Sequence, residues 1–148
     1  MRLCYNAFMI ELDNRTEKTY SMDRIEVICD ALTSLEVELI LTDNDEIAAI
    51  NRDFRGIDKP TDVLSFPSDP FPEAPLGSIV ISVDKVASVA QTLGHSEEDE
   101  LALLFIHGML HLMGFDHEVD NGEMRAKETE LIETFNLPKS LIVRTLEE

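Results

Sequence analysis

The stretch from Ser96 to Met113 constrains the fold more than any other part of the chain. Ser96, with Asp99 three residues later, is typical of a helix start, and a long apolar run follows it. Gly114 is expected to end this helix. Because histidines and glycines interrupt the run, it falls short of a membrane span, and the pattern predicts a long apolar helix in a soluble protein.

Short strand and helix patterns alternate along the rest of the chain. Four strands are expected, at 5–12, 35–42, 61–66 and 77–83, and five helices, at 21–33, 43–54, 84–93, 96–113 and 122–135. In the second helix, Ile47, Ile50 and Phe54 are predicted to face inward. The sequence thus predicts one α+β (α/β-like) domain over residues 1–148, a small mixed four-stranded sheet packed with about five helices.

The formal net charge of −18 limits the partners that the chain can have. It argues against broad, charge-driven binding to nucleic acid, so any such contact must be local. The acidic residues, including those within 97–100 and 118–133, are expected on solvated helix faces. Cys4 and Cys29 have no CxxC spacing and are predicted to be reduced and buried. With no signal-peptide core, the chain is expected to be cytoplasmic, with no membrane partner.

Three of the four histidines fall in the segment His107-Gly-Met-Leu-His111-Leu-Met-Gly114-Phe-Asp-His117. Helical residues four apart share one face, with Cβ atoms about 5–6 Å apart, so His107 and His111 can meet one metal ion. A positive φ at Gly114 lets His117 reach the same ion. Three imidazoles favour Zn²⁺ and leave one position open for water, although Ni²⁺ and Co²⁺ also accept imidazoles. Three histidines at this spacing disfavour the alternative of packed core histidines.

Residues beside these histidines indicate the chemistry. The spacing is that of a zincin-type metal helix, but Gly108 stands where the proteases carry their catalytic glutamate, so ordinary zinc-protease chemistry is not expected. A glycine inside a helix costs about 1 kcal/mol relative to alanine, which indicates either a group approaching the backbone or close packing against a neighbouring element. Asp116 either has a functional role, in which it orients a ligand imidazole or accepts a proton, or simply forms the turn before His117.

A second motif makes the chain recognisable. The segment NRDFRGIDKPTDVLSFP at 51–67, followed by Leu76-Gly77, by Gly94-His95-Ser96 and by the histidine segment, closely resembles the YbeY family over residues 39–117. The resemblance implies a metal-dependent, single-strand-specific endoribonuclease that acts in 3′-end maturation of small-subunit (16S) rRNA and in ribosome quality control. It implies zinc ligation by the three histidines. Ser78 departs from the pattern, because many relatives have aspartate there.

The resemblance also assigns a functional role to Arg55. A guanidinium can hold phosphate oxygens and neutralise charge that develops on them, whereas the alternative is an ordinary salt bridge to Asp58 or Asp62. The neighbouring polar residues either line the substrate cleft or serve the turn; they are Lys59, Thr61, Asp62 and Ser65. His95 is expected to have a local structural role rather than to bind metal.

Three functions therefore stand as hypotheses. The leading one is a zinc-dependent endoribonuclease in which Arg55 and the three histidines are catalytic, with single-stranded RNA and the small ribosomal subunit as partners. The second is a zinc peptidase or amidohydrolase, which Gly108 weakens. The third is a non-catalytic ribosome-assembly factor whose structural metal stabilises the fold and whose acidic surface docks a basic ribosomal protein.

Overall fold

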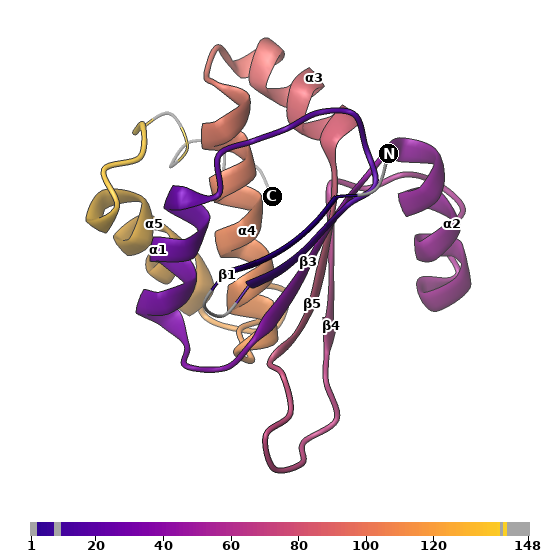
Figure 1. Cartoon of the computed structure of the whole chain (residues 1–148). Helices are drawn as coiled ribbons and strands as arrows, with labels where there is room; N and C mark the ends of the chain where they lie inside the picture. Colours follow the sequence, from indigo (N-terminus) through magenta and orange to yellow (C-terminus); the bar gives the residue numbers. More distant parts are fainter. Residues whose placement is uncertain (1–2, 8–9, 140, 142–148) are drawn as a thin grey trace.

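The computed structural model describes residues 3–7, 10–139 and 141, which form a mixed sheet packed with helices (Figure 1). The strands are β1 (Leu3–Ala7), β2 (Ile10–Asn14), β3 (Val37–Thr42), β4 (Val63–Pro67) and β5 (Gly77–Ser82). The helices are α1 (Asp23–Leu32), α2 (Asn44–Arg55), α3 (Val83–Leu93), α4 (Glu97–Leu112) and α5 (Glu123–Thr134). The expected α+β class and mixed sheet are confirmed. Across the described ranges, no helix is long and apolar enough to cross a membrane.

The sheet has the strand order β1-β2-β3-β5-β4. The pairs β2–β3 and β3–β5 are parallel, whereas β1–β2 and β4–β5 are antiparallel. The sheet therefore has five strands rather than the expected four, because the single strand predicted at 5–12 is two strands that pair with Ala7 opposite Ile10. Phe8 and Met9, between them, lie outside the described residues, and neither residue type marks a turn in a sequence.

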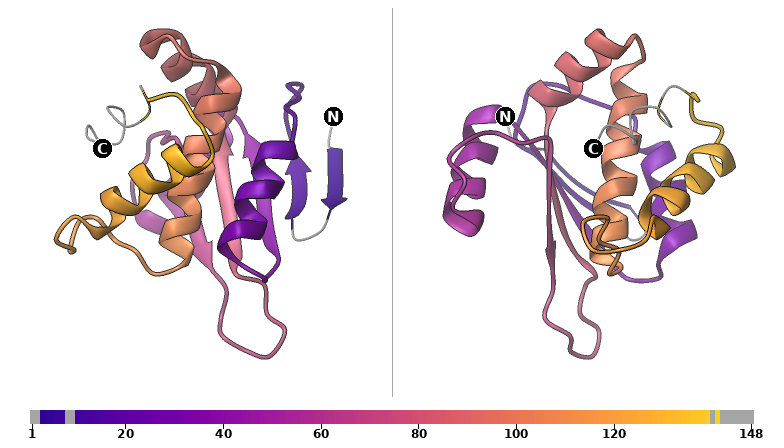
Figure 2. Two further views of the ribbon diagram at one scale, coloured as in Figure 1. Left: turned by 90° about the vertical axis from the view of Figure 1, so that its left-hand side faces the viewer. Right: turned by 180° about the vertical axis from the view of Figure 1, so that it is seen from behind.

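Helix α4 packs on the sheet and contacts three other helices, α1, α3 and α5 (Figures 1 and 2). Its start is the predicted one, since the Ser96 hydroxyl accepts a hydrogen bond from the Asp99 amide at 3.0 Å. Most of its residues are buried, among them Phe105 at 0% exposure. This side of the sheet holds the larger apolar core. Cys29 is buried in this core and is free, as predicted. The structure does not describe the burial of Cys4, so that prediction stays untested.

Gly108 brings α4 close to strand β5. A Cβ atom at this position would lie 2.9 Å from Cγ2 of Ile79, which is closer than side chains normally approach. The Ser65 hydroxyl on β4 donates to the Gly108 carbonyl at 3.2 Å. Of the two explanations for this glycine, the structure supports packing against a neighbouring element. The contact places the histidine-bearing half of α4 beside the β4 edge of the sheet.

Helix α2 covers the opposite face (Figure 1). The Asp43 side chain caps it, and Ile47 is fully buried in a small cluster with Leu64 and Val80. The prediction that Phe54 faces inward is wrong, because its side chain is 71% exposed. It lies in the last turn of α2, and its ring meets that of Phe66 edge-on at 5.2 Å. Helical spacing does place Phe54 on the side of α2 that points toward β4, where it meets Phe66. The ring is nevertheless exposed, because no other described element covers it.

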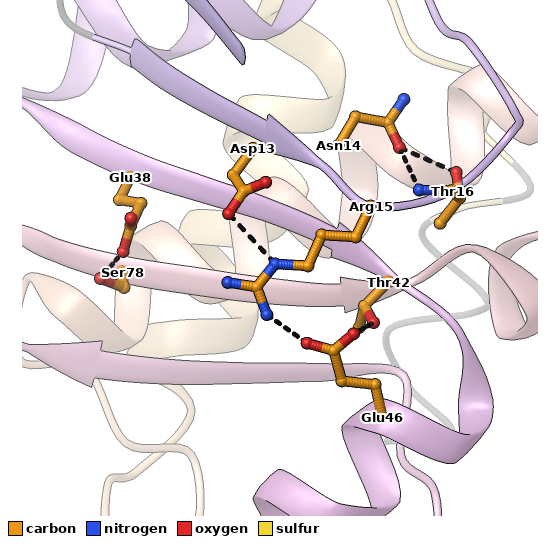
Figure 3. Close-up of polar contacts among 8 residues, drawn as sticks. All are labelled: Asp13, Asn14, Arg15, Thr16, Glu38, Thr42, Glu46 and Ser78. Carbon is orange, nitrogen blue, oxygen red and sulfur yellow. Dashed lines mark hydrogen bonds and ion pairs between the residues drawn. The ribbon is translucent and has the colours of Figure 1, made fainter. Parts of the chain in front are cut away.

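Polar contacts join α2 and the strands on this second face (Figure 3). Arg15 forms ion pairs with Asp13 at the end of β2 and with Glu46 on α2. Thr42 donates to the other carboxylate oxygen of Glu46 at 2.8 Å.

Ser78, which replaces the common family aspartate, belongs to the same face (Figure 3). Its hydroxyl donates to Oε1 of Glu38 at 2.7 Å, and the two residues are paired across β5 and β3. A carboxylate is therefore present beside position 78, although it comes from the neighbouring strand.

Candidate metal and substrate site

The three histidines of the predicted cluster lie together at the C-terminal end of α4. His107 and His111 are one helical turn apart, and their Nε2 atoms are 3.0 Å from each other. Gly114 has φ +99°, the left-handed conformation expected after the helix, and the following loop returns His117 to within 5.9 Å of both rings, centroid to centroid. One nitrogen from each of the three side chains falls within 4.8 Å of the others, so the cluster can hold a metal ion.

Hydrogen bonds on the far sides of the rings fix where the protons are. Nδ1 of His107 lies 3.0 Å from the carboxylate of Glu128, and Nδ1 of His111 lies 3.1 Å from the carbonyl oxygen of Phe115. Both partners are acceptors, so each Nδ1 carries the proton and each Nε2 presents a lone pair. Two lone pairs at 3.0 Å repel each other unless a cation lies between them.

A shared proton is disfavoured as that cation. Burial lowers the pKa of His111 below its ordinary value, and the neighbouring His107 lowers it further. Nδ1 of His117 is buried and makes no hydrogen bond within the described part of the chain, so no protein acceptor there fixes its tautomer. Neutral imidazoles that converge through unprotonated nitrogens are the donor set that divalent Zn²⁺, Ni²⁺ or Co²⁺ prefers. The residues present therefore fit a metal ion.

Glu128 is a site residue that the sequence analysis missed. It is fully buried on α5, whereas the acids of this segment were expected on solvated faces. Glu100, fully buried beside His95 at 2.8 Å, is a second exception to that expectation. One signal marks Glu128: with Met124, Leu131 and Ile132 it lies on the apolar stripe of its helix, where an unpaired carboxylate would be costly. A buried carboxylate behind an imidazole is the arrangement that orients metal-binding histidines.

The histidines open into a cleft of about 450 Å³ between β4 and the loop after α4. The cleft also contains most of the other residues singled out from the sequence: Arg55, Thr61, Asp62, Ser65 and Asp116 all line it. Lys59 does not line it; its side chain is exposed, and its backbone carbonyl accepts from the Asn51 amide at 3.0 Å. The cleft combines a cation site, one guanidinium and short polar side chains.

Several of these residues already have structural partners. Ser65 is bonded to Gly108, as above, and an oxygen of the Asp116 carboxylate accepts from the Glu118 amide at 3.0 Å, which makes Asp116 a turn residue at the cleft wall. Arg55 differs from them. Its side chain is exposed and makes no hydrogen bond or ion pair with the residues that the structure describes, so the salt bridge to Asp58 or Asp62 is not present.

The chain is thus an α+β protein with a mixed sheet. Three converging imidazoles that can hold a metal ion lie in an open cleft beside an arginine. The family model described as "Endoribonuclease YbeY" matches residues 9–136. This chain belongs to the YbeY endoribonuclease family.

Relatives and a solved structure agree with that assignment. A protein of Nautilia profundicola named endoribonuclease YbeY is 56% identical over 136 residues, which cover 92% of this chain and 98% of the relative. One of Campylobacter jejuni with the same name is 60% identical over 127 residues, 85% of this chain and 94% of the relative. The solution structure of TM1509 from Thermotoga maritima is similar with a TM-score of 0.55 and 36% identity, covering 76% of this chain and 77% of that one.

Proposed function

We propose that this chain is a zinc-dependent, single-strand-specific endoribonuclease that acts in 3′-end maturation of small-subunit (16S) rRNA and in ribosome quality control in the cytoplasm. Family membership supports RNA as the substrate class. The observation that carries the chemistry is the convergence of three imidazoles on a cleft that Arg55 also lines. That arrangement supports the proposal that one phosphodiester meets both the ion and the guanidinium of Arg55 in the same cleft.

The residues of the chain have separate tasks in this proposal. His107, His111 and His117 would hold the ion, which would supply Lewis acidity and lower the pKa of water to about 7. Glu128 keeps the proton on Nδ1 of His107 and so keeps Nε2 free to bind. Arg55 binds the phosphate oxygens and stabilises the charge that develops on them during hydrolysis.

Two features of the site weigh against the rival functions. A peptidase of this geometry needs a glutamate at position 108, and a side chain there would meet Ile79 of the sheet. A purely structural metal would have a closed ligand set, whereas these histidines line an open cleft. The observations therefore favour hydrolysis of RNA over both alternatives.

The strongly acidic chain also bears on the partners we propose. Single-stranded RNA enters at the cleft, and a basic protein of the small ribosomal subunit binds the acidic surface and offsets its repulsion of RNA. Domain organisation stays a prediction, with residues 1–148 as one catalytic domain.

Cleavage of labelled single-stranded and duplex RNA by wild type and arginine variants tests the proposal. Arg55→Ala should lower the cleavage rate by about 10²-fold or more, because a stabilising contact to the transition state is lost. Arg24→Ala is the matched control, since Arg24 pairs with Asp99 away from the cleft and its loss should leave cleavage unchanged. Zinc-loaded wild type that cuts no single-stranded RNA, or cuts duplex equally well, would contradict the proposal.

A further inference from the structure

Phe54 and Phe66 form an aromatic pair at the surface that has no role in the proposed cleavage reaction. Phe54 is 71% exposed, and its ring meets that of Phe66 at 5.2 Å with 61° between the ring planes. Phe66 is partly buried against the small cluster under α2, which holds it in place. Phe54 therefore presents an apolar ring to solvent on a supported base.

The pair lies directly behind the cleft. Arg55, which lines the cleft, follows Phe54 in the chain, and Ser65 and Pro67, which also line it, flank Phe66. Alternate residues of a strand point to opposite faces, so the aromatic pair and the cleft lie on the two sides of β4. Because β4 is at the edge of the sheet, an extended chain that crosses this edge meets both.

The segment that carries Phe54 has a small net positive charge. Residues 51–60 carry three cations and two acids, whereas the chain as a whole has a net charge of −18. Arg52, Arg55 and Lys59 supply the positive charge, and all three are exposed. Repulsion of a polyanion is therefore lower here than the net charge of the chain implies, which favours RNA over a basic protein as the occupant of this surface.

We propose that Phe54, supported by Phe66, is a stacking platform for an unpaired base next to the phosphate that Arg55 binds. This inference rests on the proposed function and deepens it. Base stacking on aromatic rings tolerates any sequence, since every base has a π face. It requires that face to be open, and in a duplex the neighbouring pairs cover it. The platform thus supplies a physical basis for preference for single strands.

Fluorescence gives a direct test, because the chain contains no tryptophan. Phe54→Trp places a single indole at the platform, and Phe71→Trp places one at another exposed phenylalanine, in the β4–β5 loop at 60% exposure. A single-stranded oligoribonucleotide should quench the emission of the first variant and leave that of the second unchanged. Inorganic polyphosphate, which has charge but no bases, should quench neither. Equal quenching by polyphosphate, or none by RNA that binds, would overturn the stacking platform.

Binding constants provide the second measurement. Phe54→Ala should weaken binding of single-stranded RNA by about 5- to 150-fold, the range for loss of one stacked base, and Phe54→Tyr should restore it. Phe71→Ala should bind as wild type does. Wild-type binding by Phe54→Ala would overturn this inference alone and leave the endoribonuclease proposal standing. Failure of wild type to bind or cleave RNA would overturn both.

Discussion

The two faces of the sheet are built in different ways. On the face under α4, three further helices close over a large apolar core, and the candidate metal ligands lie at its margin. On the other face α2 stands over a cluster of three buried residues, polar contacts connect the strands, and Phe54 remains exposed. The difference shows that apolar periodicity predicts burial only where another element of the fold covers the apolar face of a helix. It also separates the densely packed face, whose margin carries the three histidines, from the thinly covered face that carries Phe54.

Replacing a phenylalanine by alanine on each face is the strongest test of this difference between the two faces. Phe105→Ala removes a fully buried ring from the α4 side and should lower the free energy of unfolding by about 3–5 kcal/mol. Phe54→Ala should change it by no more than about 0.5 kcal/mol, since its ring is largely solvated. Urea denaturation of both variants measures the difference. Similar losses in the two would contradict the difference in packing between the faces.

Glu128 tests whether the covered face also orients the metal site. Glu128→Gln keeps the side-chain shape but removes the charge behind His107, and metal affinity should fall by about 10- to 100-fold. Competition with a chelator measures the affinity. Glu130→Gln, two residues along the same helix and exposed, is the control and should bind metal normally. If the Glu128 variant bound metal as tightly as wild type, the carboxylate would not orient the histidine.

Gly108 tests how closely α4 must approach the sheet. Gly108→Ala should destabilise the fold by about 1–3 kcal/mol through its clash with Ile79, despite the better helix propensity of alanine. In the Ile79→Ala background the added methyl group has room, so the same change should no longer cost stability. Thermal unfolding of the four proteins completes the cycle, and additive losses would show that the contact does not limit the approach.

The smallest effect is expected from the polar contacts of the α2 face. Thr42→Val removes the hydrogen bond to Glu46 while keeping the side-chain shape, and should cost about 1 kcal/mol. Thr134→Val, which loses an exposed bond to the Glu130 carbonyl at the end of α5, should cost less than about 0.5 kcal/mol. The midpoints of denaturant unfolding measure the stability loss of each variant. No loss in the Thr42 variant would mean that these contacts contribute little to holding α2.

Local features of the fold and site were predictable from the sequence. The Ser96 cap and the positive φ of Gly114 act within a few residues, and the histidine spacing places His107, His111 and His117 within one helix and one turn. Features that depend on distant contacts were not. Glu128 reaches His107 only because α5 packs on α4. Phe8 and Met9, between β1 and β2 in the sequence, are not residue types that favour a turn.

Helical spacing and membership of a sequence motif were also not enough to place two residues, Phe54 and Lys59. Phe54 has the spacing of an inward position, but its exposure depends on what covers α2. Lys59 shares the motif of Arg55, yet only Arg55 lines the cleft. Neighbours in sequence can thus differ in function when a helix ends between them and the chain changes direction.

The most direct test of the central claim is the metal content of purified wild type and His111→Ala by elemental mass spectrometry, with cleavage of single-stranded RNA measured on the same samples. His95→Gln serves as the control, because His95 bonds to Glu100 outside the cluster. We expect about one zinc per chain in wild type and in the control, with metal and cleavage lost together in His111→Ala. Metal and cleavage that both survive in His111→Ala would contradict it.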